Sequence, residues 1–473
     1  MDMRLNRIPS PVETIHLTAV CGTGMGALAG MLTDLGYRVT GSDQGVYPPM
    51  SDFLAGKGIP VTEGFSPANL AHGPDLVVVG NAVTRNNPEA LALAEMGIAY
   101  CSMPQAVNHF IVRDRAVLMA VGTHGKTTTA SILAWILHHA GLDPSFFIGG
   151  IVRDFQSNYR LGAGPYVVIE GDEYDTAFFD KGPKFLHYDP TIAILTSVEF
   201  DHADIFRDLA HIQEAFDRLI DRMAPASTLI SFDGDKTVAE LIQGRRCRVV
   251  PYGHRPESPW RLGRTEAAPP WTRFDVIRGG RPFGTFRTRL MGRHNLGNIL
   301  ACIAAADGIG IARAPIEAAL ESFQGPRRRQ EIRGVKRGVT VIDDFAHHPT
   351  AVLETLLAVR SFYPRERLVA VFEPRTNTSM RRVFQEVYPR VFAEADRVLI
   401  RKPSRLDKIP PEERFSSEAL VDDLKRRGMD AHHFDDTEAI LRFLAETSQQ
   451  GDVILIMSNG GFDNIHERLL AAL

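Results

Sequence analysis

The chain has 473 residues with 53 Lys and Arg against 57 Asp and Glu, a net charge of −4, so no global basic field favours a nucleic-acid partner. Its 44% apolar residues support real hydrophobic cores, and its length predicts about two to four domains. Four widely spaced cysteines form no CxxC pair, and the N-terminus lacks the apolar segment of a signal peptide. No apolar run reaches the ~20 residues of a membrane helix, so we expect a cytoplasmic protein without a membrane partner.

Strands alternate with amphipathic helices along the chain, which predicts an α/β fold of parallel sheets covered by helices. The first block opens with a strand at 15–20, a glycine turn and a helix through Leu35. Further strands are expected at 38–43, 76–82 and 98–102.

The glycine turn of this block has the sequence CGTGMGA, which gives Gly22-x-Gly24-x-x-Ala27 between a strand and a helix. Asp43 follows 21 residues after Gly22, at the end of the next strand, as in the dinucleotide-binding fingerprint. The same backbone device binds any pyrophosphate, including that of a nucleotide-sugar. The pattern therefore leaves NAD and a nucleotide-sugar open. An ATP site in the next block favours the nucleotide-sugar, because a dehydrogenase has no use for ATP.

The second block begins with a strand at 116–122 and continues into the turn THGKTTT and a helix ending at Gly141. The phosphate-loop pattern G-x-x-x-x-G-K-[ST] would place its first glycine at position 120, where the chain has Ala120. Gly122 and Gly125 still allow a tight turn whose amides point at phosphate oxygens. Lys126 is then placed to reach the β- and γ-phosphates and Thr127 to ligate Mg²⁺, while Thr128 could bind an α-phosphate, so we predict an ATP site.

Two acidic clusters follow apolar strands of the second block. Glu170, Asp172, Glu173 and Asp175 come at the end of a strand at 166–172, and Glu199, Asp201 and His202 end a strand at 191–202. Ligands collect at the carboxyl ends of strands in open α/β sheets, and ATP needs carboxylates to position magnesium. A turn role is about as probable for any single acidic residue, but two clusters beside a phosphate loop favour function.

Residues 243–285 are rich in Arg, Pro and Gly and predict a peripheral hairpin region. A third block starts near 325 and contains expected strands at 339–349, 367–375, 397–403 and 452–461. Arg375 lies just past one of these strands, where a guanidinium can grip a carboxylate with paired hydrogen bonds. Asn377, Ser458 and Asn459 are expected to join it.

Four stretches together carry a family resemblance: GTHGKTTT, E-x-D-E-x-D at 170–175, E-x-D-H at 199–202 and G-x-H-N-x-x-N at 292–298. They resemble the Mur ligases, which use ATP and Mg²⁺ to join an amino acid or peptide to the carboxylate of a UDP-N-acetylmuramoyl precursor. The resemblance implies three domains: a Rossmann-like UDP-binding domain (1–112), a central P-loop ATPase-type domain with a parallel or mixed sheet (113–326) and a C-terminal Rossmann-like, peptide-binding domain (327–473).

The resemblance also implies roles for residues at matching positions. The catalytic set is expected to be Lys126, Glu170, His202 and Arg328, with Thr127, Glu170 and His202 as the metal ligands. The ATP-binding set is expected to be Gly122, Thr123, His124, Gly125, Lys126, Thr127, Thr128, His294, Asn295, Asn298 and Asp343. The UDP-sugar set is expected to be Gly22, Thr23, Gly24, Met25, Gly26, Ser42 and Asp43.

Within the family, the stretches at 41–54, 372–381 and 457–466 resemble the branch that attaches the tripeptide L-alanyl-γ-D-glutamyl-meso-diaminopimelate to UDP-N-acetylmuramate. The implied activity is carbon–nitrogen bond formation through an acyl phosphate in peptidoglycan recycling. His347 or His348 is the candidate base for the incoming amine, and hinges are expected near 110–114 and 325–334. The alternatives are the branch that attaches L-alanine and, from another class, an NAD-dependent oxidoreductase or a nucleotide-sugar sensor. The sequence does not indicate an oligomeric state.

Overall fold

The computed structural model describes residues 2–203, 205–404, 406 and 409–473. The chain forms two compact units, which are described separately below. Unit 1 comprises Met1–Glu199, Ala210–Trp260 and Ala301–Ala319, and unit 2 comprises Phe200–Leu209, Arg261–Leu300 and Leu320–Leu473. Among the described residues, every helix is either too short or too polar to span a membrane.

The first sheet of unit 1 has the strand order β3-β2-β1-β4-β5, and all its pairings are parallel. Its strands are β1 (Thr14–Thr18), β2 (Arg38–Asp43), β3 (Val61–Glu63), β4 (Leu76–Val79) and β5 (Tyr100–Ser102). Its helices are α1 (Thr23–Asp34), α2 (Met50–Gly56), α3 (Pro88–Met96) and α4 (Met103–Val107), with short turns η1 (Met3–Leu5) and η2 (Pro67–Leu70) and a π-helix η3 (Asn108–Val112). This order, with β1 between β2 and β4, is that of a Rossmann-like half.

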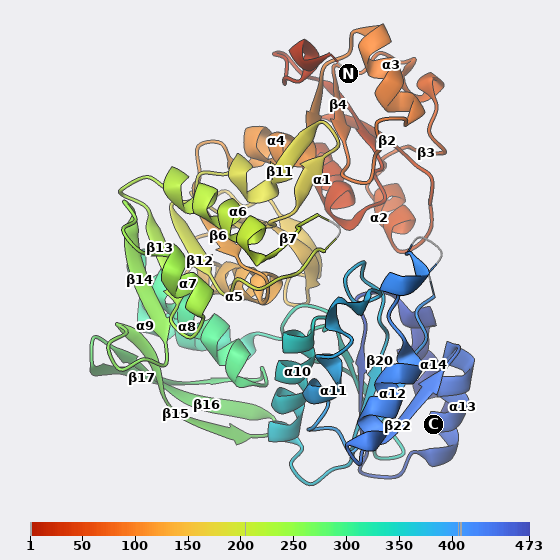
Figure 1. Ribbon diagram of the computed structural model, residues 1–473. Coiled ribbons are helices and arrows are strands. Elements are labelled where there is room, and N and C mark those ends of the chain that lie inside the picture. The colour runs from red at the N-terminus through yellow and green to blue at the C-terminus, as the bar shows by residue number, and fades with distance from the viewer. Residues whose placement is uncertain (1, 204, 405, 407–408) are drawn as a thin grey trace. The chain divides into compact units, whose positions relative to one another are not determined.

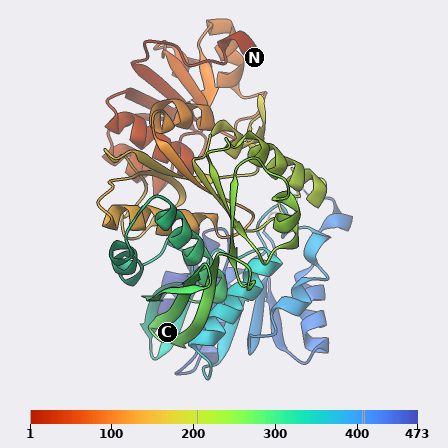
Figure 2. The same cartoon turned by 90° about the vertical axis from the view of Figure 1, so that its left-hand side faces the viewer.

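The second sheet contains the order β14-β13-β12-β6-β9-β7-β8, and the pairings among these seven strands are parallel except for β7–β8. Its strands are β6 (Ala116–Val121), β7 (Ser145–Val152), β8 (Ser157–Arg160), β9 (Tyr166–Gly171), β12 (Ile192–Leu195), β13 (Thr228–Phe232) and β14 (Arg248–Gly253). A separate hairpin is formed by β10 (Asp175–Ala177) and β11 (Asp180–Pro183). The accompanying helices are α5 (Lys126–His139), η4 (Lys184–His187), α6 (Leu209–Arg222) and α7 (Lys236–Leu241). These elements can be followed in Figure 1 and from the side in Figure 2.

Unit 2 contains the sheet β18-β19-β23-β20-β21-β22, which is parallel except for β18–β19. These strands are β18 (Glu331–Lys336), β19 (Val339–Asp344), β20 (Leu368–Phe372), β21 (Arg397–Arg401), β22 (Asp430–Phe434) and β23 (Val453–Met457). The helices are α10 (Pro349–Phe362), α11 (Tyr388–Val391), α12 (Ser417–Arg426), α13 (Thr437–Thr447) and α14 (Ile465–Ala472), with η5 (Arg382–Phe384), η6 (Pro411–Glu413) and η7 (Phe462–Asn464). The same unit holds β15 (Trp260–Ala268, all but its first residue), β16 (Trp271–Arg278) and β17 (Arg281–Thr288), while α8 (Arg293–Gly308) and α9 (Arg313–Ser322) have residues in both units.

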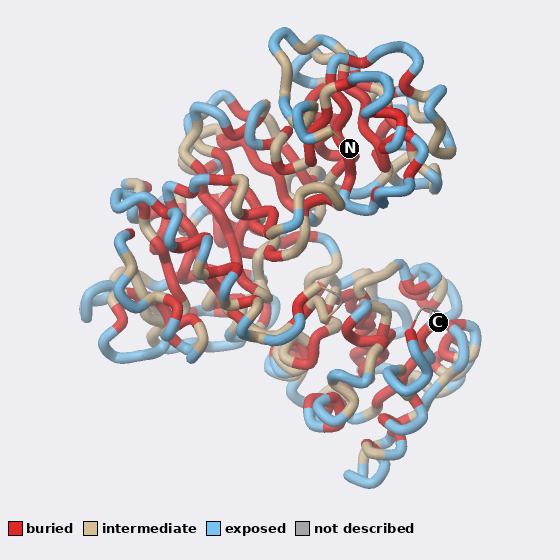
Figure 3. Tube along the Cα trace, turned by 45° about the horizontal axis from the view of Figure 1, so that its top comes forward, coloured by how far each residue is buried: buried red, intermediate tan, exposed pale blue. Residues whose placement is uncertain are grey.

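Alternate residues of the unit 2 strands enter two different cores. Ala370 and Phe372 of β20 pack in one core with residues of α10 and α12, whereas Val369 and Val371 pack in the other with residues of α13 and α14. A parallel sheet covered by helices on both faces explains why its strands read as unbroken apolar runs. Figure 3 shows the result, with buried strands and mostly exposed connections.

The structure confirms the α/β class and most of the expected strands, with shorter ends. The expected strand at 191–202 is wrong beyond Leu195, because the following backbone leaves the sheet to bond the phosphate turn: Ser197 O accepts from Thr123 N at 2.9 Å. The expected hairpin region at 243–285 contains β16 and most of its antiparallel partner β17, which continues to Thr288. Strand β7 was not predicted from the sequence, because the pair Gly149-Gly150 within it is typical of a turn.

Candidate functional site

The turn between β6 and α5 is shaped by two glycines with positive φ. Gly122 has φ +126° and Gly125, which precedes the first residue of α5, has φ +79°. A Cβ on Gly122 would lie 2.8 Å from the carbonyl oxygen and 2.9 Å from the amide nitrogen of Ser197, so no side chain fits there. The turn therefore delivers backbone amides and the positive end of a helix to one place, as a phosphate site requires.

Ala120 belongs to β6 and not to the turn. It is fully buried and lies in register between Ile194 of β12 and Glu170 of β9. The first position in the turn that requires glycine is instead Gly122, because the backbone of Ser197 leaves no room for a Cβ there. This placement explains how a chain without the textual loop pattern still makes the turn.

Lys126 is the first residue of α5, and its ammonium group bonds the turn itself. Its Nζ donates to Gly122 O at 2.7 Å and to the carboxylate of Glu173 at 2.9 Å. Both side chains are largely buried, with 13% and 2% of their surfaces exposed. Burial lowers the pKa of Lys126, but the charges of Glu173, Asp172 and Glu170 outweigh it and raise that pKa above its ordinary value. Lys126 is thus a fixed positive charge inside the turn.

Thr127 and Glu170 bring two oxygen atoms together at the ends of α5 and β9. Thr127 Oγ1 donates to Glu170 Oε1 at 2.5 Å, and the other carboxylate oxygen accepts from the amide of Gly149. Burial and the charge of Asp172 raise the pKa of Glu170. A hydroxyl and a carboxylate beside a phosphate turn are the hard oxygen ligands that Mg²⁺ prefers, so the donor set fits that ion.

Thr123 and His124 contact the segment after β12. Thr123 Oγ1 accepts from the amide of Glu199 at 2.9 Å, and His124 Nε2 lies 3.4 Å from Glu199 Oε2. Glu199 therefore lies beside the phosphate turn through a loop, four residues past the end of β12. Thr128 follows on α5 and is buried.

The first glycine turn is locked by Asp43, whose Oδ2 accepts from the amide of Cys21 at 2.8 Å. Gly22 precedes α1 without a side-chain cap, and Gly22 and Thr23 are exposed. Met25 and Gly26 are buried instead, and the Met50 side chain of α2 occupies the space beside Gly26. Gly24 is half-buried beside Met103. The exposed start of α1 is consistent with an anion site. Two residues of the predicted UDP-sugar set, Met25 and Gly26, are instead buried in the core.

Ser42 belongs to a buried polar cluster that the sequence did not reveal. Its hydroxyl donates to Glu89 Oε2 at 2.7 Å, and Thr18 donates to the same oxygen at 2.8 Å. Asn69 donates to the other carboxylate oxygen, and His16 lies 3.6 Å from the carboxylate. The cluster links β1 and β2 to α3. The Ser42 hydroxyl is therefore used in a buried structural hydrogen bond.

In unit 2, Asp201 and His202 are joined to the histidines that follow β19. The Asp201 carboxylate accepts from the amide of His202 at 2.7 Å and lies 3.9 Å from His347 Nε2. His348 Nε2 lies 3.2 Å from Phe200 O. Burial opposes ionisation, but the charges of His347, His202 and His348 lower the pKa of Asp201 to about 2.

His294, Asn295 and Asn298 lie in the first turns of α8 and meet Gln330, which the sequence did not single out. Asn295 Nδ2 donates to Met291 O at 2.8 Å and to Gln330 Oε1 at 3.2 Å. Asn298 bonds Asn295, and His294 lies 3.4 Å from the Gln330 amide group. These three predicted ATP-binding residues thus form one polar network with Gln330 within unit 2.

Arg328 has φ +60° and is fixed by three contacts. Its Nη2 donates to Ser458 O at 2.5 Å, its Nε lies 3.4 Å from Asp343, and its amide donates to Glu331. Asp343 is buried, and although burial opposes it, His466, Arg328 and Arg333 lower its pKa. Asp343 therefore helps to hold Arg328 in place, and its contact with the nucleotide remains a prediction.

Arg375 and Ser458 follow neighbouring strands, β20 and β23, and lie close together. Arg375 Nη1 is 3.8 Å from Glu373 Oε2, and Ser458 Oγ donates to the same oxygen at 2.6 Å. Asn377 is exposed and Asn459 half-buried in the adjoining loops. The four predicted peptide-binding residues thus gather at one edge of the unit 2 sheet. The buried Glu373 was missed because a carboxylate after an apolar strand reads as a turn residue.

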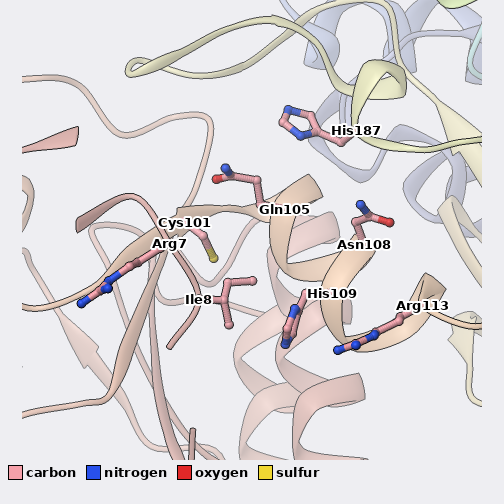
Figure 4. Close-up of a pocket in the computed structure, with 8 residues that line it drawn as sticks. All are labelled: Arg7, Ile8, Cys101, Gln105, Asn108, His109, Arg113 and His187. Carbon is pink, nitrogen blue, oxygen red and sulfur yellow. The ribbon is translucent and has the colours of Figure 1, made fainter. Parts of the chain in front are cut away.

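A pocket of about 420 Å³ lies elsewhere in unit 1, between the N-terminal segment and η3 (Figure 4). Arg7, His109, Arg113 and His187 line it, together with Ile8, Cys101, Gln105 and Asn108. None of these residues is among those predicted for ATP, UDP-sugar, metal or peptide.

Three family models match successive parts of the chain. They are described as the Mur ligase family catalytic domain, over 14–115, the Mur ligase middle domain, over 121–306, and the Mur ligase glutamate ligase domain, over 328–460. The chain belongs to the Mur ligase family. This Mur ligase has the three-domain α/β architecture of the family.

Relatives of this Mur ligase cover nearly its full length. The UDP-N-acetylmuramate–L-alanyl-γ-D-glutamyl-meso-2,6-diaminoheptandioate ligase of Escherichia coli (strain K12) is 42% identical, over 97% of this chain and 98% of its own. A UDP-N-acetylmuramate–L-alanine ligase of Endomicrobium trichonymphae is 32% identical over 97% and 98%. The crystal structure of a murein peptide ligase from Psychrobacter arcticus matches with a TM-score of 0.71 and 35% identity, over 97% and 98%.

Proposed function

We propose that this Mur ligase joins L-alanyl-γ-D-glutamyl-meso-diaminopimelate to the lactyl carboxylate of UDP-N-acetylmuramate, in the cytoplasm, during peptidoglycan recycling. The observation that carries the proposal is the turn before α5, where Gly122, Gly125 and the buried Lys126 make a phosphate site. The acceptor is supported by the name of the Escherichia coli relative and its 42% identity.

The reaction proceeds in two steps. A carboxylate oxygen of UDP-N-acetylmuramate attacks the γ-phosphorus of ATP, which forms an acyl phosphate and releases ADP. The tripeptide amine then attacks the carbonyl carbon, and the C–O bond to phosphate breaks to leave an amide and inorganic phosphate. Phosphoryl transfer of this kind depends on positioning and on neutralised charge.

The residues of the phosphate turn supply that positioning. Lys126 Nζ, 2.7 Å from Gly122 O and 2.9 Å from the Glu173 carboxylate, is fixed where it can meet the γ-phosphate. Thr127 and Glu170 would hold Mg²⁺, for which their paired oxygens are suited. His202 stays a predicted ligand of that ion. When bound, Mg²⁺ neutralises phosphate charge.

Unit 2 supplies a base and a further positive charge. The tripeptide amine must lose a proton, and His347 is the candidate acceptor. Its Nδ1 lies 3.0 Å from Phe345 O, which orients the ring, and the charge of Asp201, 3.9 Å from Nε2, stabilises its protonated form. Arg328 is held by Asp343 and Ser458 O with its guanidinium preset for a phosphate. His294, Asn295 and Asn298 are assigned to ATP, and the exposed start of α1 to the UDP pyrophosphate.

The tripeptide brings several carboxylates, and Arg375 is assigned to one of them. Its side chain is 31% exposed just past the carboxyl end of β20, where ligands of open sheets bind. Asn377, Ser458 and Asn459 line the same edge.

The L-alanine ligase remains the rival inside the family, since relatives of that name are 30–34% identical. The oxidoreductase and sensor readings are set aside, because the chain belongs to a family of ligases.

ADP release with each acceptor in turn tests the proposal. We expect release that requires UDP-N-acetylmuramate together with the tripeptide, at least about 100-fold faster in kcat/KM than with L-alanine, since an unfilled charged subsite costs several kcal/mol. Faster release with L-alanine contradicts the acceptor assignment. Release that needs neither substrate contradicts the ligase itself.

A further inference from the structure

Arg375 lies against the backbone of Gly460 in unit 2. A Cβ built on Gly460 would come within 2.5 Å of Arg375 Cζ and still closer to Cδ and Nε. No real side chain tolerates such a distance. The backbone of Gly460 is outside the positive-φ region, so its conformation by itself accepts any residue. The three atoms nearest to that Cβ all belong to the Arg375 side chain, which therefore accounts for the requirement for glycine at this position.

The guanidinium of Arg375 has few partners of its own. Among the described residues, its contact with a polar side chain is the Glu373 carboxylate, 3.8 Å from Nη1. That distance is an ion pair without a tight hydrogen bond, so most of its N–H donors remain for a ligand. The side chain is 31% exposed, which leaves one side of the guanidinium accessible.

Glu373 beneath it is a rigid anchor. It is 1% exposed, and it accepts from Arg401 Nη1 on one oxygen and from Ser458 Oγ, at 2.6 Å, on the other. Arg401 is held in turn by Asp463 at 2.9 Å. The amide of Gly460 donates to Ser458 Oγ at 3.0 Å, which ties the glycine into the same network. Glu373 and Gly460 therefore both contact Arg375 and limit the positions that its side chain can take.

We propose that Gly460 is a specificity-determining residue: its missing side chain is what lets the Arg375 side chain lie against the Gly460 backbone, beside Glu373, in the orientation that binds a carboxylate of the acceptor peptide. The inference rests on the proposed function and deepens it. Any larger residue at position 460 turns the arginine away without removing it. Because the displaced atoms are the far end of a flexible side chain, the fold adapts easily and the acceptor site does not.

The test compares Gly460→Ala with Gly461→Ala in the full chain. Gly461 is the matched control, since no atom lies within 4 Å of a Cβ built there and its φ is −70°. We expect Gly460→Ala to raise the KM for the tripeptide about 10-fold or more, as a lost charge-assisted hydrogen bond would. KM for ATP, kcat at saturating tripeptide and the melting temperature should stay within about twofold or a few degrees of wild type. Gly461→Ala should match wild type throughout.

A double-mutant cycle with Arg375→Ala shows whether the effect acts through the arginine. In the Arg375→Ala background, Gly460→Ala should change the tripeptide KM by less than about twofold. An unchanged KM in Gly460→Ala, or an equal loss in both backgrounds, overturns the inference. If Gly460→Ala alone fails to fold, the double variant, which lacks the clashing side chain, should fold; its failure to do so also overturns the inference.

The wild-type assay separates this inference from the proposed function. If wild type releases ADP only with another acceptor, the acceptor assignment fails. The cycle then reports on that acceptor, and its additivity alone decides whether Gly460 acts through Arg375.

Discussion

Lys126 concentrates the charge of the phosphate turn in one buried ammonium group. Replacement by Met keeps the apolar stem and removes the charge, so we expect kcat/KM for ADP release to fall at least about 100-fold. Lys236→Met is the control, because that lysine is 93% exposed on α7. ADP release near the wild-type rate in Lys126→Met would show that the nucleotide lies elsewhere.

Glu89 is a buried carboxylate whose ionisation stabilises the first sheet. Burial raises its pKa, but hydrogen bonds from His16, Asn69, Ser42 and Thr18 outweigh it and lower that pKa below 4.5. The stabilisation is therefore complete above about pH 4.5 and is lost as pH falls through the lowered value.

The corresponding variant is Glu89→Gln, measured by urea unfolding between pH 7 and pH 4. We expect it to unfold with a free energy about 1–3 kcal/mol lower than wild type at pH 7, because an amide cannot accept all these hydrogen bonds. The difference should narrow as pH falls below about 4.5. A difference that stays constant with pH would mean that the charge of Glu89 contributes nothing.

Residues whose local chemistry is strong were predictable from the sequence, and those defined by close approach were not. Lys126 and Thr127 belong to a sequence pattern that predicts a phosphate-binding turn. Glu373 and Gly460 acquire meaning only when β20 and β23 lie side by side. The sequence MSNGG does not show that Gly460 contacts Arg375 whereas Gly461 does not.

The junction between β6 and the phosphate turn explains why a glycine at position 122, instead of 120, still allows the turn to form. Ala120 is a strand residue, so Ala120→Gly should leave the KM for ATP within about twofold and lower the unfolding free energy by about 1 kcal/mol. Gly122→Ala places a Cβ against the backbone of Ser197 at a positive φ. We expect it to raise the KM for ATP at least about 10-fold. Improved ATP binding by Ala120→Gly would contradict this reading.

Strand positions were predictable because buried parallel strands are continuous apolar runs, but their ends were not. The segment after β12 continues in apolar and β-branched residues, and only the hydrogen bonds to Thr123 show that it leaves the sheet. Strand β7 shows the opposite error, since a glycine pair can lie inside a strand.

At the scale of the whole molecule, an acyl phosphate must be kept from water, so we expect ligands to close the domains. The hinges near 110–114 and 325–334 and the domain limits 1–112, 113–326 and 327–473 remain predictions. Small-angle scattering should show a smaller radius of gyration with UDP-N-acetylmuramate and a non-hydrolysable ATP analogue together. Lys126→Met with the same ligands is the control and should not contract. An unchanged radius in wild type would contradict closure.

The three-domain order was predictable from the sequence, because motifs in each block resemble one family. The assembly of sites was not, since Asp201 joins His347 and Gln330 joins Asn295 across more than thirty residues of chain each. Such pairings follow from tertiary folding, which no local pattern encodes.

The transfer of oxygen from the substrate to phosphate tests the central claim most directly. UDP-N-acetylmuramate labelled with ¹⁸O in its lactyl carboxylate is incubated with ATP, Mg²⁺ and the tripeptide, and the released phosphate is analysed by mass spectrometry. Activation of the carboxylate at the phosphate turn predicts one ¹⁸O atom in each phosphate formed from fully labelled substrate. Phosphate free of ¹⁸O, alongside amide product, would contradict the account.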